Sequence, residues 1–125
     1  MKTHHLLTPV ALLLVLYGSV TASAEFYDSP GGADTNPGSQ EKAFATLERA
    51  RDTVRAMKHQ DGMLKDGCTV WLLEGDYVLD KSLELTAADS GTADAPVFWR
   101  AAPGAKVHLL GGRVITIRLE DLKHF

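Results

Sequence analysis

Hydrophobic residues recur at two different spacings along this chain, and each spacing predicts a different kind of element. Four of them follow one another at intervals of three or four residues: Leu47, Ala50, Val54 and Met57. This spacing is that of one face of an α-helix. Thr46 precedes them, and a hydroxyl at that position can accept a hydrogen bond from a free amide of the first turn. The pattern predicts a helix that begins after Thr46 and buries one narrow stripe.

The polar residues of the same segment agree with a helix. Lys58 and His59 suit the negative end of the helix dipole, and Gly62 ends the pattern. Three arginines lie off the apolar stripe and are interpreted as a solvated face of the helix: Arg49, Arg51 and Arg55.

Elsewhere, short hydrophobic runs alternate with turn residues, which is typical of β-strands. Phe26 and Tyr27 predict a first strand, which ends where a proline and two glycines follow at 29–32. Later runs cover residues 68–73, 77–79, 82–86, 97–100 and 107–110. Within 82–86, strict alternation places Leu83 and Leu85 on one face of a strand. The fold class predicted from this pattern is mainly β.

The spacing of these strands favours stacked coils over a meander of hairpins. Val70 and Val97 are 97 − 70 = 27 positions apart, and Leu83 and Val107 are 107 − 83 = 24 positions apart. Repeats of this length are typical of solenoids, and a helix across the first coil would cover its open edge. Residues 68–113 number only 113 − 68 + 1 = 46, less than two such coils, whereas stacked repeats need about three units. We therefore expect an incomplete fold, either the front piece of a longer protein or a truncated gene product.

The loop before the helix carries the most specific motif of the chain. Asp34, Asn36 and the pair Pro37-Gly38 predict a loop of defined shape, because Asx side chains bond nearby backbone and Pro-Gly suits a turn. From Phe26 onward the chain resembles the N-terminal cap of secreted right-handed parallel β-helix proteins, the pectate-lyase-like superfamily. The matching positions are Ser29, Pro30, Gly32, Asp34, Asn36, Pro37, Gly38, Phe44, Ala45, Thr46, Leu47, Ala50 and Arg51.

The resemblance departs at Ser39 and Ala43, where the superfamily usually has threonine and proline, and it ends at Arg113. It implies the start of a right-handed parallel β-helix with an N-terminal capping α-helix. It implies a strand, loop and capping helix at 25–67 and first coils at 68–113. A signal peptide predicted at 1–24 precedes them, and a tail of uncertain structure at 114–125 follows. Members that act on polysaccharides take their catalytic acids from later coils, so the resemblance assigns no catalytic residue here.

Residues 1–24 predict an exported protein. Lys2 supplies a basic start, an apolar run ends at Tyr17, and Ala22-Ser23-Ala24 resembles a small-residue cleavage site. Cleavage after Ala24 would release a secreted or periplasmic chain of 125 − 24 = 101 residues, enough for one small domain. An uncleaved membrane anchor is the alternative, although the apolar run is short and interrupted.

Charge and cysteine content limit the partners. With 13 Lys+Arg and 16 Asp+Glu the formal net charge is −3, which gives no reason to expect nucleic acid or an anionic membrane. The resemblance instead implies a polysaccharide or oligosaccharide. Cys68 is the single cysteine, so no internal disulfide can form, and we interpret it as a buried structural residue, with pairing to another chain as the alternative.

Few residues are candidates for acid–base chemistry. Glu74 and Asp76 would share one face of an extended strand, the minimum for a pair of acid and base carboxylates. They flank Gly75, however, so a turn is the preferred interpretation. Asp80 and Glu84 are weaker candidates, and we expect Glu84 on the solvated face of a strand.

Metal and phosphate sites are predicted no more strongly. Asp28, Asp34 and Asn36 could offer oxygen ligands to calcium, but Asx turns account for the last two. No cofactor is therefore predicted, and calcium is the alternative. Two single histidines, His59 and His108, lack partners at zinc spacing. A glycine pair at 111–112, Gly111 and Gly112, lacks the lysine and the helix of a phosphate loop.

Aromatic residues offer the last candidate chemistry, since sugar rings stack on aromatic faces. Trp71 and Trp99 both lie inside apolar runs, so core packing is the preferred interpretation. Tyr77, beside a turn, is the better exposed candidate. Two function classes stay open: the N-terminal part of an exported glycoside hydrolase or lyase whose catalytic coils lie outside this chain, or a non-catalytic glycan- or protein-binding fragment or gene relic.

Overall fold

The computed structural model describes residues 23–60 and 64–112. Within this part of the chain the elements are β1 (Ala24–Asp28), α1 (Leu47–Lys58), β2 (Cys68–Leu72), β3 (Gly75–Val78), the short 3₁₀-helix η1 (Ala87–Asp89), β4 (Val97–Ala101) and β5 (Val107–Leu110). Almost all of the predicted signal peptide and all of the predicted tail at 114–125 lie outside the described residues.

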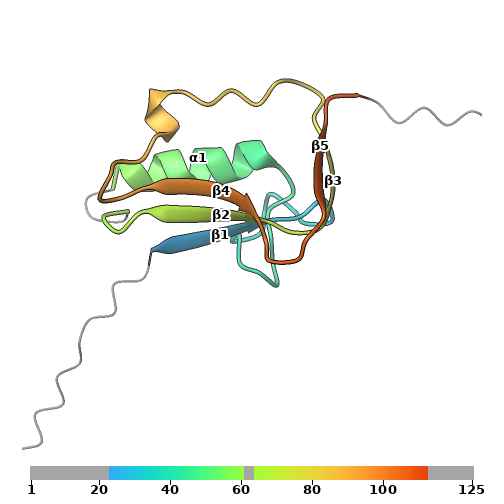
Figure 1. Ribbon diagram of the computed structural model, residues 1–125, viewed down its shortest axis with the longest axis horizontal. Coiled ribbons are helices and arrows are strands. Elements are labelled where there is room, and N and C mark those ends of the chain that lie inside the picture. The colour runs from blue at the N-terminus through green and yellow to red at the C-terminus, as the bar shows by residue number, and fades with distance from the viewer. Residues whose placement is uncertain (1–22, 61–63, 113–125) are drawn as a thin grey trace, which may run out of the picture.

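The described strands pair in parallel and form two sheets. The first sheet has the order β1-β2-β4, with Phe26 opposite Val70 and Val70 opposite Trp99. The second sheet pairs β3 with β5, with Tyr77 opposite Leu109. The chain turns from the first sheet into the second after β2 and again after β4, and the two sheets run in different directions (Figure 1). The segments 68–78 and 97–110, which we call the two passages, therefore each contribute one strand to the first sheet and one strand to the second.

The spacing in sequence between paired strands is longer than the predicted repeat. Cys68 pairs with Val97, which is 97 − 68 = 29 residues later, and Gly75 pairs with Val107, 107 − 75 = 32 residues later. The repeat between the runs that contain Val70 and Val97 is confirmed, because β2 pairs with β4, although Val70 lies opposite Trp99. The repeat between Leu83 and Val107 is wrong, because Leu83 lies in no strand and β5 pairs with β3.

The segment 79–96, which we call the crossover loop, explains why residues 82–86 form no strand. It passes over α1 on its way from β3 to β4 (Figure 1). A strand needs a neighbouring backbone with free donors and acceptors, whereas a helix bonds its own backbone internally. Leu83 packs against the core, but Leu85 is 51% exposed. The predicted alternation of buried and solvated faces in this segment is therefore wrong.

Helix α1 confirms the prediction from hydrophobic spacing. Thr46 is its N-cap, and the Thr46 hydroxyl accepts a hydrogen bond of 3.2 Å from the Arg49 amide. Three of the four predicted stripe residues are buried and Met57 is half-buried. The helix ends at Lys58, with His59 as its C-cap, before the predicted end at Gly62.

The core lies between α1 and the first sheet. Its buried members come from the helix at helical spacing, from alternate positions of β2, and from single positions of the loop and β3: Phe44, Leu47, Ala50, Val54, Cys68, Val70, Leu72 and Tyr77. Because strand residues alternate between faces, Trp71 of β2 points away from this core.

The loop before α1 has the defined shape that its sequence predicts. The Asp34 carboxylate accepts hydrogen bonds from the Ala45 and Thr46 amides, both at 2.9 Å, and from the Thr46 hydroxyl at 2.7 Å. Gly38 has φ 82°, and a Cβ there would lie 2.5 Å from the Phe44 ring. The loop therefore needs glycine at this turn both for its backbone conformation and for close packing.

The predicted solvated arginine face of α1 holds for Arg49, which is exposed, but is wrong for Arg51 and Arg55, because these two bind the crossover loop. Arg55 forms a bidentate ion pair with Asp89, at 2.6 and 2.7 Å. Further side-chain donors reach backbone oxygens of the loop, namely Arg51 to Glu84 at 3.2 Å and Lys58 to Ala88 and Ser90 at 2.7 and 2.6 Å. Helix α1 is thus enclosed between the first sheet and the crossover loop (Figure 1).

At the level of fold class, the described part is mainly β, with one α-helix and small parallel sheets, as predicted. Two sheets are present in residues 23–60 and 64–112, and they do not close into a complete coil there. The predicted β-helix is therefore a proposal, which we take up below.

Candidate functional site

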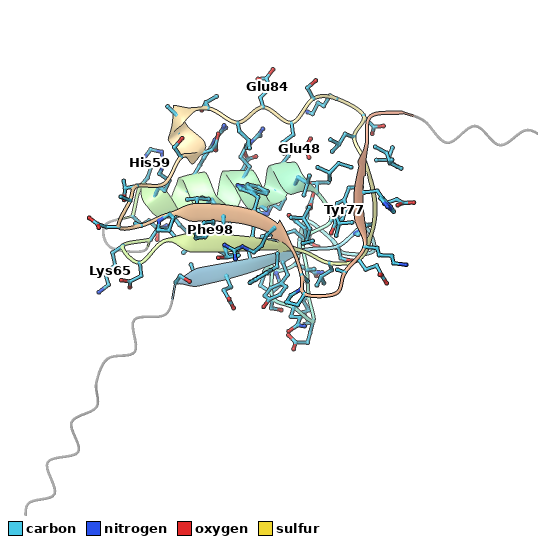
Figure 2. The ribbon with its side chains drawn as sticks, in the orientation of Figure 1. Glu48, His59, Lys65, Tyr77, Glu84 and Phe98 are labelled. Atoms are coloured by element: carbon cyan, nitrogen blue, oxygen red, sulfur yellow. The ribbon has the colours of Figure 1, made fainter. Side chains whose placement is uncertain are left out.

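A cavity of about 560 Å³ lies between the start of α1 and β3. Figure 2 places Glu48 and Tyr77 at this end of the helix, whereas His59 lies at its other end. Three carboxylates and one lysine line the cavity: Glu48, Asp76, Asp80 and Lys81. Two facing carboxylates are the minimum for glycoside hydrolysis, so this cavity is the first candidate for catalysis.

The carboxylates of this cavity do not have the surroundings of a general acid. Asp76, on β3, lies 2.8 Å from Nδ1 of His108, on β5, and the two side chains are 62% and 64% exposed. Glu74 lies at the corner before β3, where its carboxylate accepts a hydrogen bond of 3.3 Å from the Lys106 amide. A carboxyl that donates a proton near neutral pH needs shielding from water. The structure therefore gives Glu74 and Asp76 roles in joining the two passages of the chain.

The contact between Asp76 and His108 joins two neighbouring strands, and it adds no second histidine or cysteine to His108. The two residues are opposite each other in the parallel register of β3 and β5. His59 is exposed at the end of α1, while Asp80 and Glu84 are exposed on the crossover loop. Glu84 is drawn above α1 in Figure 2, away from the cavity.

The calcium alternative is not supported by the side chains proposed for it. Asp34 already accepts three hydrogen bonds at the helix start, and the Asn36 amide donates to the Ala43 oxygen at 2.9 Å. Among the described residues, no group of three or more His, Cys, Asp or Glu side chains is placed to hold a metal ion.

Asp28, the third predicted calcium ligand, is instead an isolated buried acid. Its side chain is 0% exposed, and neither carboxylate oxygen has a hydrogen-bond partner in the described part of the chain. Burial, together with the nearby carboxylates of Asp34 and Glu48, raises the pKa of Asp28 to about 7. Because the residue is closed to solvent, this perturbed carboxyl affects stability rather than substrate.

Cys68 is buried in the core, as predicted, and burial raises the pKa of its thiol to about 11. The thiolate is the reactive form of cysteine, so this side chain is chemically inert in the folded protein.

The glycines at 111–112 are exposed after β5, with open space around them. None of the described helices is long and apolar enough to span a bilayer.

The aromatic side chains that are buried are not all the ones that the sequence predicts to be buried. Trp99 packs against the core, as expected. Tyr77 is only 4% exposed, and its hydroxyl donates to the Asp28 and Leu73 backbone oxygens at 2.8 and 2.9 Å. The prediction that Tyr77 is the exposed candidate is therefore wrong, since β3 turns its side chain into the core.

The prediction that Trp71 packs in the core is wrong, because β2 directs its side chain to the outer face of the first sheet, and sequence reasoning missed its neighbours there. The guanidinium carbon of Arg100 lies 5.5 Å from the centre of the Trp71 ring and 4.3 Å from that of Phe98. Phe98 is 45% exposed, on β4 (Figure 2). The alternation of residues 97–100 is the signal that could have placed Phe98 and Arg100 on one face.

Comparisons with solved structures identify similar folds. One glycoside hydrolase is similar with a TM-score of 0.69 and 33% identity, over 73% of this chain and 15% of that chain. A rhamnogalacturonan lyase is similar with a TM-score of 0.50 and 24% identity, over 70% of this chain and 21% of that chain. No family model and no curated protein sequence matches the chain.

The two neighbours are carbohydrate-active proteins by name, and the lyase likeness concerns fold alone because of its low identity. The chain spans less than a quarter of the length of either neighbour. What is shared is therefore a small part of each larger protein.

Proposed function

We propose that this chain is the N-terminal capping part of an exported, polysaccharide-active protein with a right-handed parallel β-helix, whose catalytic coils lie outside the chain. The observation that carries the proposal is the similarity to a glycoside hydrolase, at 33% identity over 73% of this chain but only 15% of that one. In this proposal the chain contributes a stable start to the fold, and the chemistry belongs to later coils.

The last described strand supports this proposal. Leu109 lies opposite buried Tyr77 and two positions after Val107, which packs against the core. Residues two apart in a strand share a face, so the Leu109 side chain faces inward. It is nevertheless 55% exposed. Among residues 23–60 and 64–112, no strand pairs with the outer edge of β5. An inward-facing leucine at such an edge is a position that a following coil would cover, as stacked repeats do for one another.

Export is the second part of the proposal, and it rests on the signal-like sequence at 1–24. The proposed cleavage after Ala24 would fall within β1, since Ala24 is its first residue and the Ala24 amide donates to the Gly67 oxygen at 3.1 Å. The mature strand would then begin at Glu25 and keep the pairs from Glu25–Thr69 to Asp28–Leu72. The intact mass of the exported product tests this position.

The alternative is a fragment that binds glycan or protein without catalysis. The specific observation in its favour is the outer face of the first sheet, where Phe98 is 45% exposed and Trp71 is half-buried. The two functions differ in whether coils that carry catalytic acids follow in the same protein.

The deciding experiment has two parts. The first is to sequence the gene and its transcript through and beyond the codon for Phe125. The second replaces the matching segment of the similar glycoside hydrolase with residues 23–112 of this chain and measures soluble yield and hydrolysis. A working cap should restore both, whereas the same graft carrying Ala50→Asp should not, because Ala50 is 0% exposed in the core. A transcript without further coils, together with an intact graft that restores nothing, would refute the proposal.

A further inference from the structure

The outer face of the β1–β2–β4 sheet, on the side away from the core, carries side chains that folding alone does not require. Residues that alternate with the core-facing positions of the three strands lie on this face. The parallel register aligns them in two rows: Glu25, Thr69 and Phe98, then Tyr27, Trp71 and Arg100. Aromatic residues and arginine are the types in which interfaces between proteins are enriched.

Trp71, at the centre of the face, holds the two charged residues in place. Its indole N–H donates to the Glu25 carboxylate at 3.2 Å. The Arg100 guanidinium lies 5.5 Å from the Trp71 ring centre and 4.3 Å from the Phe98 ring centre. Stacking of this kind fixes the plane of a guanidinium and leaves the N–H donors at its edge available.

The two charges lie at opposite corners of the face. Glu25 is on β1 in the first row, and Arg100 is on β4 in the second row. Two strand spacings and two residue steps separate their Cα atoms by about 12 Å. Both side chains are exposed, and in the described part of the chain neither forms an ion pair. Opposite charges at opposite corners make a face complementary to a second copy of itself, because a twofold rotation exchanges the corners.

We propose that this face is the interface of a symmetric dimer, in which each Glu25 pairs with Arg100 of the partner subunit. The twofold axis would lie between the two sheets, perpendicular to the line that joins Glu25 to Arg100. From strand spacing, the strands of the two copies would then cross at about 70°, close to the orthogonal class of sheet packing. The two long side chains together span the gap of about 10 Å between packed sheets.

The same axis also brings the aromatic side chains together. From strand spacing, the Cα positions of Tyr27, Trp71 and Phe98 project within about 2 Å of the axis. Each ring would therefore face its own copy in the partner, and aromatic pairs stabilise an interface beyond the area that they bury. The face has two rows of three side chains, fewer than the about 20 to 30 residues of a standard interface. We therefore expect a weak dimer, with a dissociation constant in the micromolar range or above.

The dimer does not depend on the proposed function, because it uses the first sheet and not the following coils. Leu109, which is 55% exposed on the second sheet, offers a separate route to association. A twofold dimer closes at two copies, whereas pairing of free strand edges continues to larger assemblies. Every chain in the test therefore carries Leu109→Lys, so that the outer face is measured alone.

The test is sedimentation of the purified chain over a range of concentrations. We expect a monomer–dimer equilibrium that weakens as salt rises. Arg100→Glu and Glu25→Arg should each raise the dissociation constant at least about tenfold, because each change places like charges opposite each other twice. An equimolar mixture of these two variants should form the dimer again, since opposite charges then face each other at both pairs.

Arg49→Glu is the matched control, because it makes the same change of charge at an exposed position of α1, away from this face. It should leave the dissociation constant unchanged. Each variant is first checked for the wild-type far-UV spectrum, and recovery in the mixture shows independently that both variants are folded.

A wild-type dimer that persists in Arg100→Glu, or a mixture that stays monomeric while the wild type dimerises, would overturn the proposal. A chain that stays monomeric at every concentration would also overturn it. A graft that restores the hydrolase would still support the cap function in that case, so the two proposals fail separately.

Discussion

At the scale of single residues, Asp28 has the strongest consequence for stability. An unfolded aspartate has a pKa near 4, whereas burial and neighbouring carboxylates raise that of Asp28 to about 7. Between these values the folded protein keeps a proton that the unfolded chain has released. The free energy of unfolding should therefore fall by about 1.4 kcal/mol per pH unit as pH rises through this window, and level off above pH 7.

The measurement is urea unfolding at intervals from pH 4 to 8, for the wild type and for Asp28→Asn. The amide cannot ionise, so the variant should lose the slope and gain stability relative to wild type as pH rises. Asp76→Asn is the matched control, because Asp76 is 62% exposed, and it should keep the wild-type slope. An unchanged slope in Asp28→Asn would show that another group is responsible.

At the scale of elements, the crossover loop should depend on one ion pair. Asp89 is 7% exposed and is held by the Arg55 guanidinium, while its carboxylate also accepts from the Thr86 amide at 2.6 Å. These hydrogen bonds lower the pKa of Asp89 to about 2. The pair therefore stabilises the fold above about pH 4, and this contribution is lost as pH falls toward 2.

We expect Asp89→Asn to lower the Tm by several degrees and to increase hydrogen exchange in residues 79–96 more than in α1. Arg55→Ala should give the same pattern, and the double variant should add little, because both changes remove one interaction. Asp52→Asn is the control, since Asp52 is 54% exposed beside the same arginine. Faster exchange throughout the core would contradict a local role for the pair.

The start of α1 gives a second prediction at this scale. Thr46→Ala removes the N-cap acceptor and the hydroxyl partner of Asp34, so we expect a loss of about 1 to 2 kcal/mol in urea unfolding. Thr46→Ser keeps the hydroxyl and should lower the free energy of unfolding much less.

Because the Asp34 oxygens already accept protein hydrogen bonds, EDTA or added calcium should leave the Tm unchanged. A Tm that rises with calcium would restore the metal-binding interpretation.

The elements that the sequence predicts correctly are those whose pattern is local. Helix α1 follows from the spacing of Leu47, Ala50 and Val54 and from its cap, which need no information from the rest of the chain. The segment 82–86 has an equally regular alternation, but its neighbour in space is a helix and not a strand. Pattern therefore indicates what a segment can form, while its neighbour decides whether it does.

The candidate site was predicted less well for the same reason. Tyr77 lies beside a turn and Trp71 lies inside an apolar run, yet strand direction places Tyr77 in the core and Trp71 on the outer face. The ion pair between Arg55 and Asp89 joins residues 34 positions apart, and no local pattern indicates it. Such a pair can be proposed only once the path of the crossover loop over α1 is known.

At the scale of the whole molecule, the uncovered end of the second sheet should govern association. Three of its side chains are large, hydrophobic and exposed: Val78 at 44%, Leu109 at 55% and Leu110 at 38%. Free strand edges with apolar side chains pair readily with other chains. We expect the purified chain to self-associate in a concentration-dependent manner in sedimentation and to bind a hydrophobic dye.

Leu109→Lys should reduce both association and dye binding without changing the far-UV spectrum, because a charge at a strand edge opposes pairing with a second edge. Leu85→Lys is the matched control, since Leu85 is 51% exposed but lies on the crossover loop, and it should leave association unchanged. Fusion to the following coils of a β-helix should have the same effect as Leu109→Lys, because inward-facing Leu109 would then be covered. A monomeric wild-type chain with a cooperative melt and no dye binding would mean that β3 and β5 are stable as an uncovered edge, and the argument for a following coil would lose its structural support.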